Sequence, residues 1–245
     1  MSFGTPDNSS LSNIKQRGNA LVDTKSTASL ARQFAATSPA DRVDSDKYGR
    51  SLAASLITMG EGVITHAYDD PAQGAGRNIG TGYNLKANAE NASSDLRRAG
   101  VPAGSVQGVL DGTLQMTSDQ VSRLTQLSIQ KYETIAKDTA EKSAPGLWAK
   151  MTAPQKAVMM DVAYQVGSVD KFRNAWKALA SGDTAAFEAN VATTYVNKSG
   201  ERVTDKRRTS LRASMLAGSS TWDATVNKYG SYPSTALDVA SLNSD

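Results

Sequence analysis

The chain has 245 residues, a formal net charge of +3 and no cysteine, so it can bury a large core but cannot form disulfides or thiolate metal sites. Its one histidine, His66, leaves little for a zinc site, and we expect neither a metal nor a cofactor. The small positive charge suits an anionic polymer and is too weak to indicate nucleic acid as a partner.

The N-terminal part has no pattern typical of an export signal or a membrane anchor. Residues 1–48 are rich in Ser, Thr, Ala, Asp and Gln and lack the basic start and apolar core of a signal peptide. No apolar run in the sequence approaches the length of a bilayer span. We predict no membrane insertion, and a polar N-terminal arm with short helices that docks onto a larger body. A tail without a role is the alternative.

A helical pattern begins near residue 50. Four apolar residues recur at helical spacing: Leu52, Leu56, Met59 and Val63. They predict a helix that ends near Ala67 or Tyr68. The next segment, to about Leu85, contains Pro71 and several glycines, which predicts a small β-hairpin region.

The remainder reads as a series of helices. The capping-box patterns TSDQ at 117–120 and TAPQ at 152–155 predict two helix starts. The run KAVMMDVAYQVG predicts a buried central helix that ends at Gly167.

Further helices are expected near 169–180 and 184–196, followed by a basic helix that Thr204 caps and that ends at Gly218. Residues 219–245 are polar and predict a C-terminal arm. The predicted organisation is therefore an arm over 1–48, a domain over 49–218 and an arm over 219–245.

Carboxyl groups stand on both sides of the predicted helix end. Glu61 lies between two glycines beside an apolar helical face, and a carboxyl group partly removed from water holds its proton more readily, as a general acid must. If the hairpin folds back over the helix end, Asp69 or Asp70 faces Glu61 across a cleft. Such a pair can hydrolyse a glycosidic bond. The alternatives are a solvated or ion-paired glutamate, and an Asp-Asp-Pro sequence that merely starts a turn.

The segment EGVITHAYDD…NIGTGYNL resembles the catalytic signature of the T-even phage lysozyme family, the phage muramidases and endolysins. The residues that match are Glu61, Gly62, Tyr68, Asp70, Ile79, Gly80 and Gly82. Three more segments are similar to the family in the same order: MTSDQVSRL, QKAVMMDVAYQVGSVDKFRNAWKAL and TDKRRTSLRASMLAG. The resemblance covers about 50–218. It implies an α+β, mostly α fold with two lobes, a small β-hairpin lobe and a helical lobe, joined by a long helix near 87–100 or 118–137.

The resemblance also implies a reaction. Glu61 would protonate the glycosidic oxygen between N-acetylmuramic acid and N-acetylglucosamine in peptidoglycan, with Asp70, or else Asp69, as the ionised partner. Asn78 stands where the family has a threonine that holds the attacking water, and Thr81 could replace it only if the hairpin shifts register. Compared with the family's pattern, two extra residues separate Asp70 from Ile79. This difference leaves open whether the reaction retains or inverts the configuration of the sugar.

Four residues outside the catalytic set match positions that the family uses for substrate: Asn84, Tyr164, Gln165 and Arg207. Arg207 would lie near the catalytic glutamate, with a surface or ion-pair role as its alternative. We expect Asp161, in the apolar central helix, to be a buried and hydrogen-bonded structural residue. The DKRR cluster with Arg202 and Arg212 is interpreted as support for folding and for attraction to an anionic wall, with contact to phosphates as the alternative.

Three functions follow from these patterns. The first is a phage lysozyme that cleaves peptidoglycan glycan strands during entry or lysis, from the virion or from the host cytoplasm before delivery to the periplasm and cell wall. The second is a lytic transglycosylase that uses the same Glu61. The third is a catalytically idle module of a phage particle. In the first and third, the arms would bind phage structural proteins.

Overall fold

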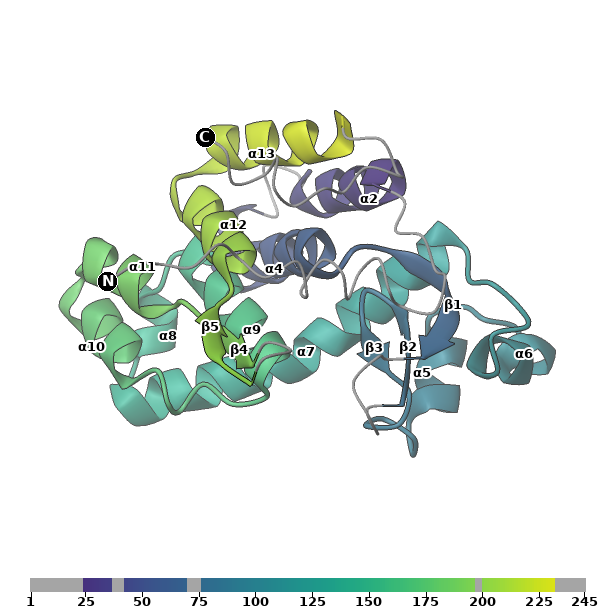
Figure 1. Cartoon of the computed structure of the whole chain (residues 1–245). Coiled ribbons are helices and arrows are strands. Elements are labelled where there is room, and N and C mark those ends of the chain that lie inside the picture. Colours follow the sequence, from purple (N-terminus) through teal and green to yellow (C-terminus); the bar gives the residue numbers. More distant parts are fainter. Residues whose placement is uncertain (1–23, 37–41, 70–75, 197–199, 232–245) are drawn as a thin grey trace. The chain divides into compact units, whose positions relative to one another are not determined.

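The structure is a computed structural model that describes residues 24–36, 42–69, 76–196 and 200–231. The fold is α+β and mostly helical (Figure 1), which confirms the predicted class. The described residues form two compact units. The first unit comprises 31–60 and 129–226, and the second comprises 24–30, 61–128 and 227–231.

The helix that carries Glu61 is shorter than the sequence predicts. After α2 (Thr24–Ala35), helix α4 covers Ser45–Glu61 and ends there because Gly62 has a left-handed backbone with φ 78°. The prediction that it continues to Ala67 or Tyr68 is wrong. The β-branched run Val63, Ile64 and Thr65 starts strand β1 (Ile64–Asp69) instead.

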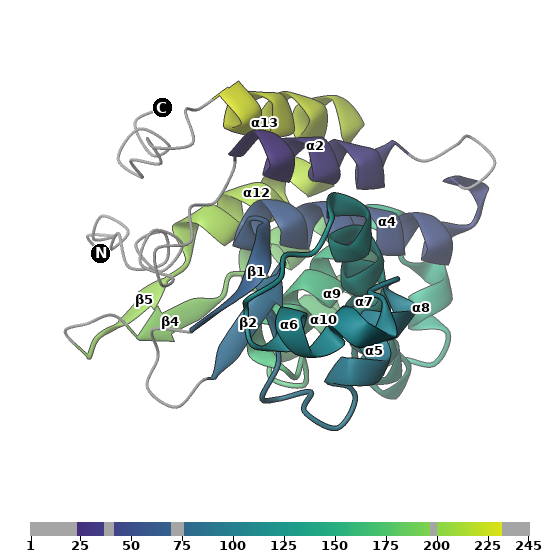
Figure 2. The ribbon, with the colours of Figure 1, turned by 90° about the vertical axis from the view of Figure 1, so that its right-hand side faces the viewer.

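The glycine-rich segment belongs to a small antiparallel sheet, as predicted. Strands β2 (Arg77–Gly80) and β3 (Tyr83–Asn84) follow β1 in the order β1-β2-β3, and Figure 2 shows β1 and β2 side by side. Short helices follow in the second unit: α5 (Ala92–Arg98), the 3-10 helix η1 (Ala103–Ser105) and α6 (Val106–Leu110).

The long helix is α7 (Ser118–Ser143), with residues up to 128 in the second unit and the rest in the first. Its predicted capping box is present, since the amide of Gln120 donates to Oγ1 of Thr117 at 3.3 Å and the amide of Thr117 donates to Oε1 of Gln120 at 2.8 Å. The alternative long helix over 87–100 is wrong, because only the short α5 forms there.

The central helix is also as predicted. After α8 (Leu147–Lys150), helix α9 covers Ala153–Val166 with a capping box between Thr152 and Gln155, and it ends at Gly167 with φ 76°. Most of its residues are buried, including Lys156 and Asp161. It forms the core of the first unit.

The last part of the chain contains a second hairpin that the sequence reading missed. Helices α10 (Arg173–Ser181) and α11 (Thr184–Asn190) are followed by strands β4 (Thr194–Val196) and β5 (Arg202–Thr204), then by α12 (Lys206–Leu216) and α13 (Ser219–Ser231). The helix predicted over 184–196 therefore stops at Asn190. The cap of α12 is Asp205 and not Thr204, because the carboxylate of Asp205 accepts from the amide of Arg208 at 3.0 Å.

Part of the predicted C-terminal arm is a packed helix. The indole of Trp222 in α13 is buried and donates to Oγ of Ser55 in α4 at 3.0 Å. The same hydroxyl donates to the carbonyl of Ala31 in α2 at 2.8 Å. Of the two predicted arms, residues 1–23, 37–41 and 232–245 lie outside the described residues.

Candidate functional site

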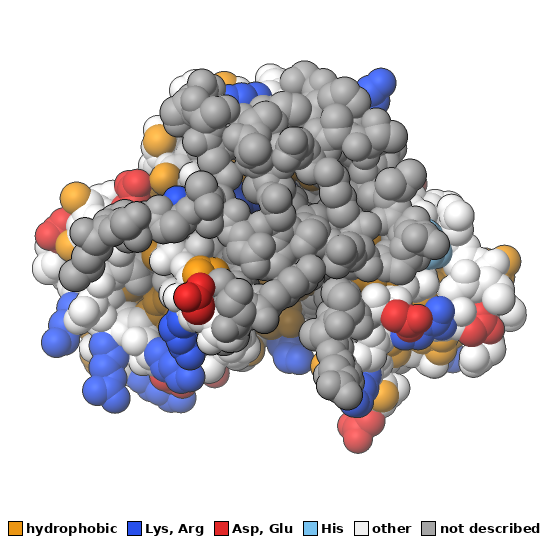
Figure 3. Space-filling model, in the orientation of Figure 1, with side chains coloured by type: hydrophobic (Ala, Val, Ile, Leu, Met, Phe, Trp, Pro, Cys, Tyr) orange, Lys and Arg blue, Asp and Glu red, His pale blue; other side chains and the backbone are white. Residues whose placement is uncertain are grey.

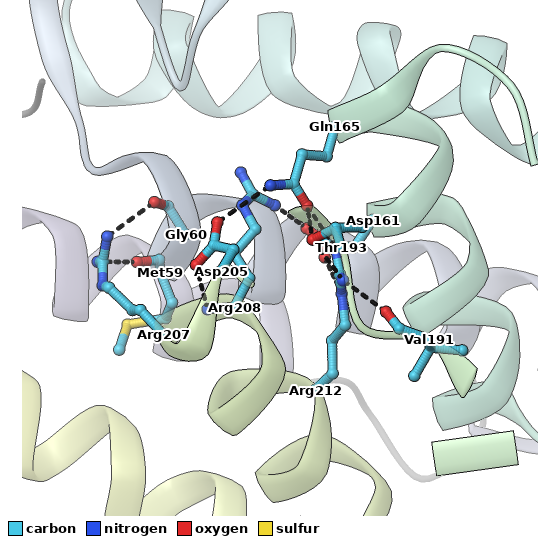
Figure 4. A network of polar contacts seen from close by, with 10 residues as sticks. All are labelled: Met59, Gly60, Asp161, Gln165, Val191, Thr193, Asp205, Arg207, Arg208 and Arg212. Atoms are coloured by element: carbon cyan, nitrogen blue, oxygen red, sulfur yellow. Dashed lines mark hydrogen bonds and ion pairs between the residues drawn. The ribbon is translucent and has the colours of Figure 1, made fainter. Parts of the chain in front are cut away.

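Glu61 is the last residue of α4 and is half-buried. The carbonyls of the preceding turn are bound by an arginine of α12. Arg207 donates to the carbonyl of Gly60 at 2.9 Å and to that of Met59 (Figure 4). A cation at a helix C-terminus offsets the partial negative charge of its carbonyls. Arg207 therefore binds the turn that ends in Glu61. Its contact with substrate stays a prediction.

Asp69 lies at the end of a strand and does not follow a helix end. Asp69 is the last residue of β1 and pairs with Arg77 across the ladder. Its carboxylate lies 3.2 Å from Nε of Arg77 and is 81% exposed. Asp70 lies outside the described residues. A cation close to a carboxylate favours its ionised form, so Asp69 stays the alternative to Asp70 as the ionised partner of Glu61.

Three residues of the motif form one row across the sheet. Tyr68 lies opposite Asn78, and Asn78 lies opposite Asn84, so their side chains share a face. Asn78 is buried, and Oδ1 of Asn84 accepts from the amide of Ala87 at 2.7 Å. Both predicted amide residues of the site thus lie side by side in the second unit.

Thr81 lies in the turn between β2 and β3. Its hydroxyl is buried and lies 2.9 Å from that of Thr125 in α7. The hairpin keeps the register in which Asn78, and not Thr81, stands in the row with Tyr68. Thr81 therefore stabilises the turn on α7.

Tyr164 and Gln165 lie at the end of α9 in the first unit. The ring of Tyr164 packs edge-on against Tyr132, with centroids 5.0 Å apart, and the guanidinium of Arg208 lies 5.9 Å from its centroid. Gln165 is tied into the network of Figure 4 through its amide, which donates to Asp205 at 3.0 Å and accepts from Arg212 at 2.8 Å.

The buried cluster beneath these residues has Asp161 at its centre. Asp161 is fully buried and pairs with Arg208 and with Arg212, the latter at 2.7 Å, which confirms its predicted structural role. Burial lowers the pKa of the Arg212 guanidinium, and the charge of Asp161 acts in the opposite direction. Arg212 also donates to the carbonyl of Val191 at 2.7 Å.

The two arginines confirm that the DKRR cluster supports folding, and they correct the expectation of attraction to an anionic wall for Arg208 and Arg212. Arg208 and Arg212 are buried, with 5% and 1% exposure, so neither can attract an anionic polymer at the surface. Residues four apart share one helix face and a buried aspartate requires a cationic partner, but neither rule says which arginines of the chain supply it. Sequence reasoning did not connect them, since 47 residues or more separate the partners.

No protein-family model, curated protein or solved structure matches the chain. Within the described ranges, no group of three or more His, Cys, Asp or Glu side chains could hold a metal ion. Of the helices in those ranges, none is long and apolar enough to cross a membrane.

Proposed function

We propose that the protein is a peptidoglycan muramidase of the phage lysozyme type, in which Glu61 is the general acid. The observation that carries the proposal is the way the motif folds: Glu61 ends α4, and Gly62 turns the chain directly into the sheet whose second strand carries Ile79 and Gly80. A carboxyl group in this setting is half-buried and held at a helix end.

The reaction needs a proton donor and an ionised partner. Glu61 donates its proton to the oxygen between N-acetylmuramic acid and N-acetylglucosamine, and Asp70 stabilises positive charge on the sugar ring or orients a water molecule. Asp69, whose carboxylate forms an ion pair with Arg77, is the alternative in this role. Tyr164, Gln165, Arg207 and Asn84 are the proposed substrate contacts.

The surface charge suits an anionic polymer as substrate. Lys and Arg side chains gather at the lower left of the face in Figure 3, and the exposed basic residues of α10 are Arg173 and Lys177. Such side chains raise the local concentration of an anionic substrate. The proposed place of action is the bacterial cell wall, reached from the virion or from the host cytoplasm.

The direct test is the variant Glu61→Gln. Because it removes the proton donor and leaves the shape nearly unchanged, we expect clearance of a peptidoglycan suspension to fall at least about 100-fold. The matched control is Glu90→Gln at an exposed position, which should clear the suspension at the wild-type rate. Equal activity of Glu61→Gln and wild type, at equal thermal stability, would contradict the proposal.

One observation favours a second candidate function, that of a lytic transglycosylase. Asn78, in the position proposed to hold the attacking water, is only 5% exposed. A lytic transglycosylase does not need that water, because the muramic acid closes onto itself after Glu61 has protonated the glycosidic oxygen. The products separate the two reactions: a free reducing end for the muramidase, an anhydro sugar for the transglycosylase. An idle module of a phage particle would release neither.

A further inference from the structure

The last turn of α4 is held by two neighbouring side chains of α12. Arg207 binds its carbonyls, as described above. Arg208 lies against Gly60 itself: a methyl group at position 60 would lie 2.9 Å from Cζ of Arg208 and 3.0 and 3.1 Å from its two terminal nitrogens. The guanidinium therefore fills the space that a side chain at position 60 would need.

Arg208 is itself fixed in place. Its guanidinium pairs with the fully buried Asp161, and its amide donates to the capping carboxylate of Asp205 at 3.0 Å. Asp161 also binds Arg212, so the carboxylate holds both cations in a defined geometry. The buried network therefore holds the guanidinium of Arg208 in its position against Gly60.

These contacts reach Glu61 through one peptide group. The carbonyl of Gly60 and the amide nitrogen of Glu61 belong to the same planar unit. A hydrogen bond to that carbonyl fixes the orientation of the peptide plane between Gly60 and Glu61. The packing of Arg208 on Gly60 restricts the movement of the same turn. A displacement of the turn would move the carboxyl group of Glu61 with it.

We propose that Asp161 and Arg208 are positioning residues for Glu61, and that glycine is required at position 60 because the guanidinium of Arg208 packs there. The role of Glu61 in this inference rests on the proposed function. The contact between Gly60 and Arg208 stands on the geometry alone, so the two can be tested separately.

The test combines Gly60→Ala with Arg208→Lys. Gly60 is helical and is not among the glycines with positive φ, so alanine strains no backbone and favours the helix. We therefore expect Gly60→Ala to act through the guanidinium, with kcat on peptidoglycan lowered about tenfold or more and KM changed less than about twofold.

Arg208→Lys keeps a charge for Asp161 but removes the flat guanidinium from Gly60. In this background, Gly60→Ala should change kcat by less than about twofold, because the alanine no longer meets the guanidinium. The control for the alanine is Gly104→Ala, where a methyl group meets nothing within 4 Å. It should leave kcat unchanged.

Hydrogen exchange supplies a measurement that does not depend on activity. In Gly60→Ala, the amides of residues 59–61 should exchange faster while those of α9 do not, whereas a general loss of stability would speed both. The inference would be overturned if Gly60→Ala had the kcat and the hydrogen exchange of wild type. It would also be overturned if Gly60→Ala lowered kcat by the same factor in the Arg208→Lys background as in wild type. A wild-type protein that cleaves no glycan would contradict the proposed function. The hydrogen-exchange result would still test whether Arg208 packs on Gly60.

Discussion

At the scale of single residues, Gly62 decides where the helix that carries Glu61 ends. The apolar spacing that includes Val63 predicts a longer helix, because periodicity reports a buried face and not the backbone conformation. The left-handed φ of 78° at Gly62 overrides that pattern. A stop at Gly62 was within reach of the sequence, since glycine after a helix is a common terminator.

Substitution of Gly62 should be costly for this reason. Alanine at a position with positive φ adopts a strained backbone, so we expect Gly62→Ala to lower the free energy of unfolding by about 1 kcal/mol or more. Urea unfolding followed by circular dichroism measures the change. Gly104→Ala, at a glycine without positive φ, is the control, and equal stability of the two variants would argue against the role given to Gly62.

The burial of Asp161 could be predicted from the sequence, and the partners of Asp161 could not. Asp161 could be recognised as buried because it stands in an apolar helix. Its partners Arg208 and Arg212 could not be assigned, because a basic run in a sequence is equally compatible with an exposed face. The contact of Arg208 with Gly60 depends on how two distant helices pack, and no local pattern encodes it.

At the scale of elements, the helix starts fixed by local chemistry and the sheet in the glycine-rich segment were predicted, and the hairpin of β4 and β5 was not. The capping boxes of α7 and α9 involve residues three apart, so the sequence alone identifies them. Strands β4 and β5 are three residues each. Strands this short are stable only where other parts of the fold support them, so the sequence does not indicate them, and the helix predicted over 184–196 extends across β4.

The start of α4 gives a prediction at this scale. The amides of Lys47 and Asp46 donate to the carboxylate of Asp44 at 3.0 Å each, and the Lys47 bond is the main reason that the pKa of Asp44 is lowered. Folding therefore favours the ionised form. This contribution is present above the ordinary pKa of aspartate and is lost as the pH falls through the lowered folded-state value.

Asp44→Asn isolates that effect, because asparagine can cap a helix but does not ionise. We expect wild type to melt at a higher temperature than Asp44→Asn near neutral pH, and the difference to vanish in acid below the lowered pKa. Thermal unfolding of both proteins over this pH range measures it. A difference that is constant with pH would contradict the assigned cause.

At the scale of the whole molecule, helical periodicity and the glycine-rich segment predicted helices and a small hairpin region, and the family resemblance implied the α+β, mostly helical class that the structure has. The two compact units were expected only from the family resemblance, and α7 contributes residues to both. The packing of α13 through Trp222 was not expected, because a polar segment with one buried aromatic residue has no clear apolar stripe. The chain therefore builds its first unit from segments at both ends of the sequence.

The central claim is that Glu61 donates a proton in the hydrolysis of a glycan, and analysis of the products tests it most directly. Purified peptidoglycan is digested in water labelled with heavy oxygen, and the fragments are weighed by mass spectrometry. We predict new reducing ends that carry one labelled oxygen with wild type, and none with Glu61→Gln. Unlabelled anhydro ends, or no cleavage by the wild-type protein, would contradict the claim.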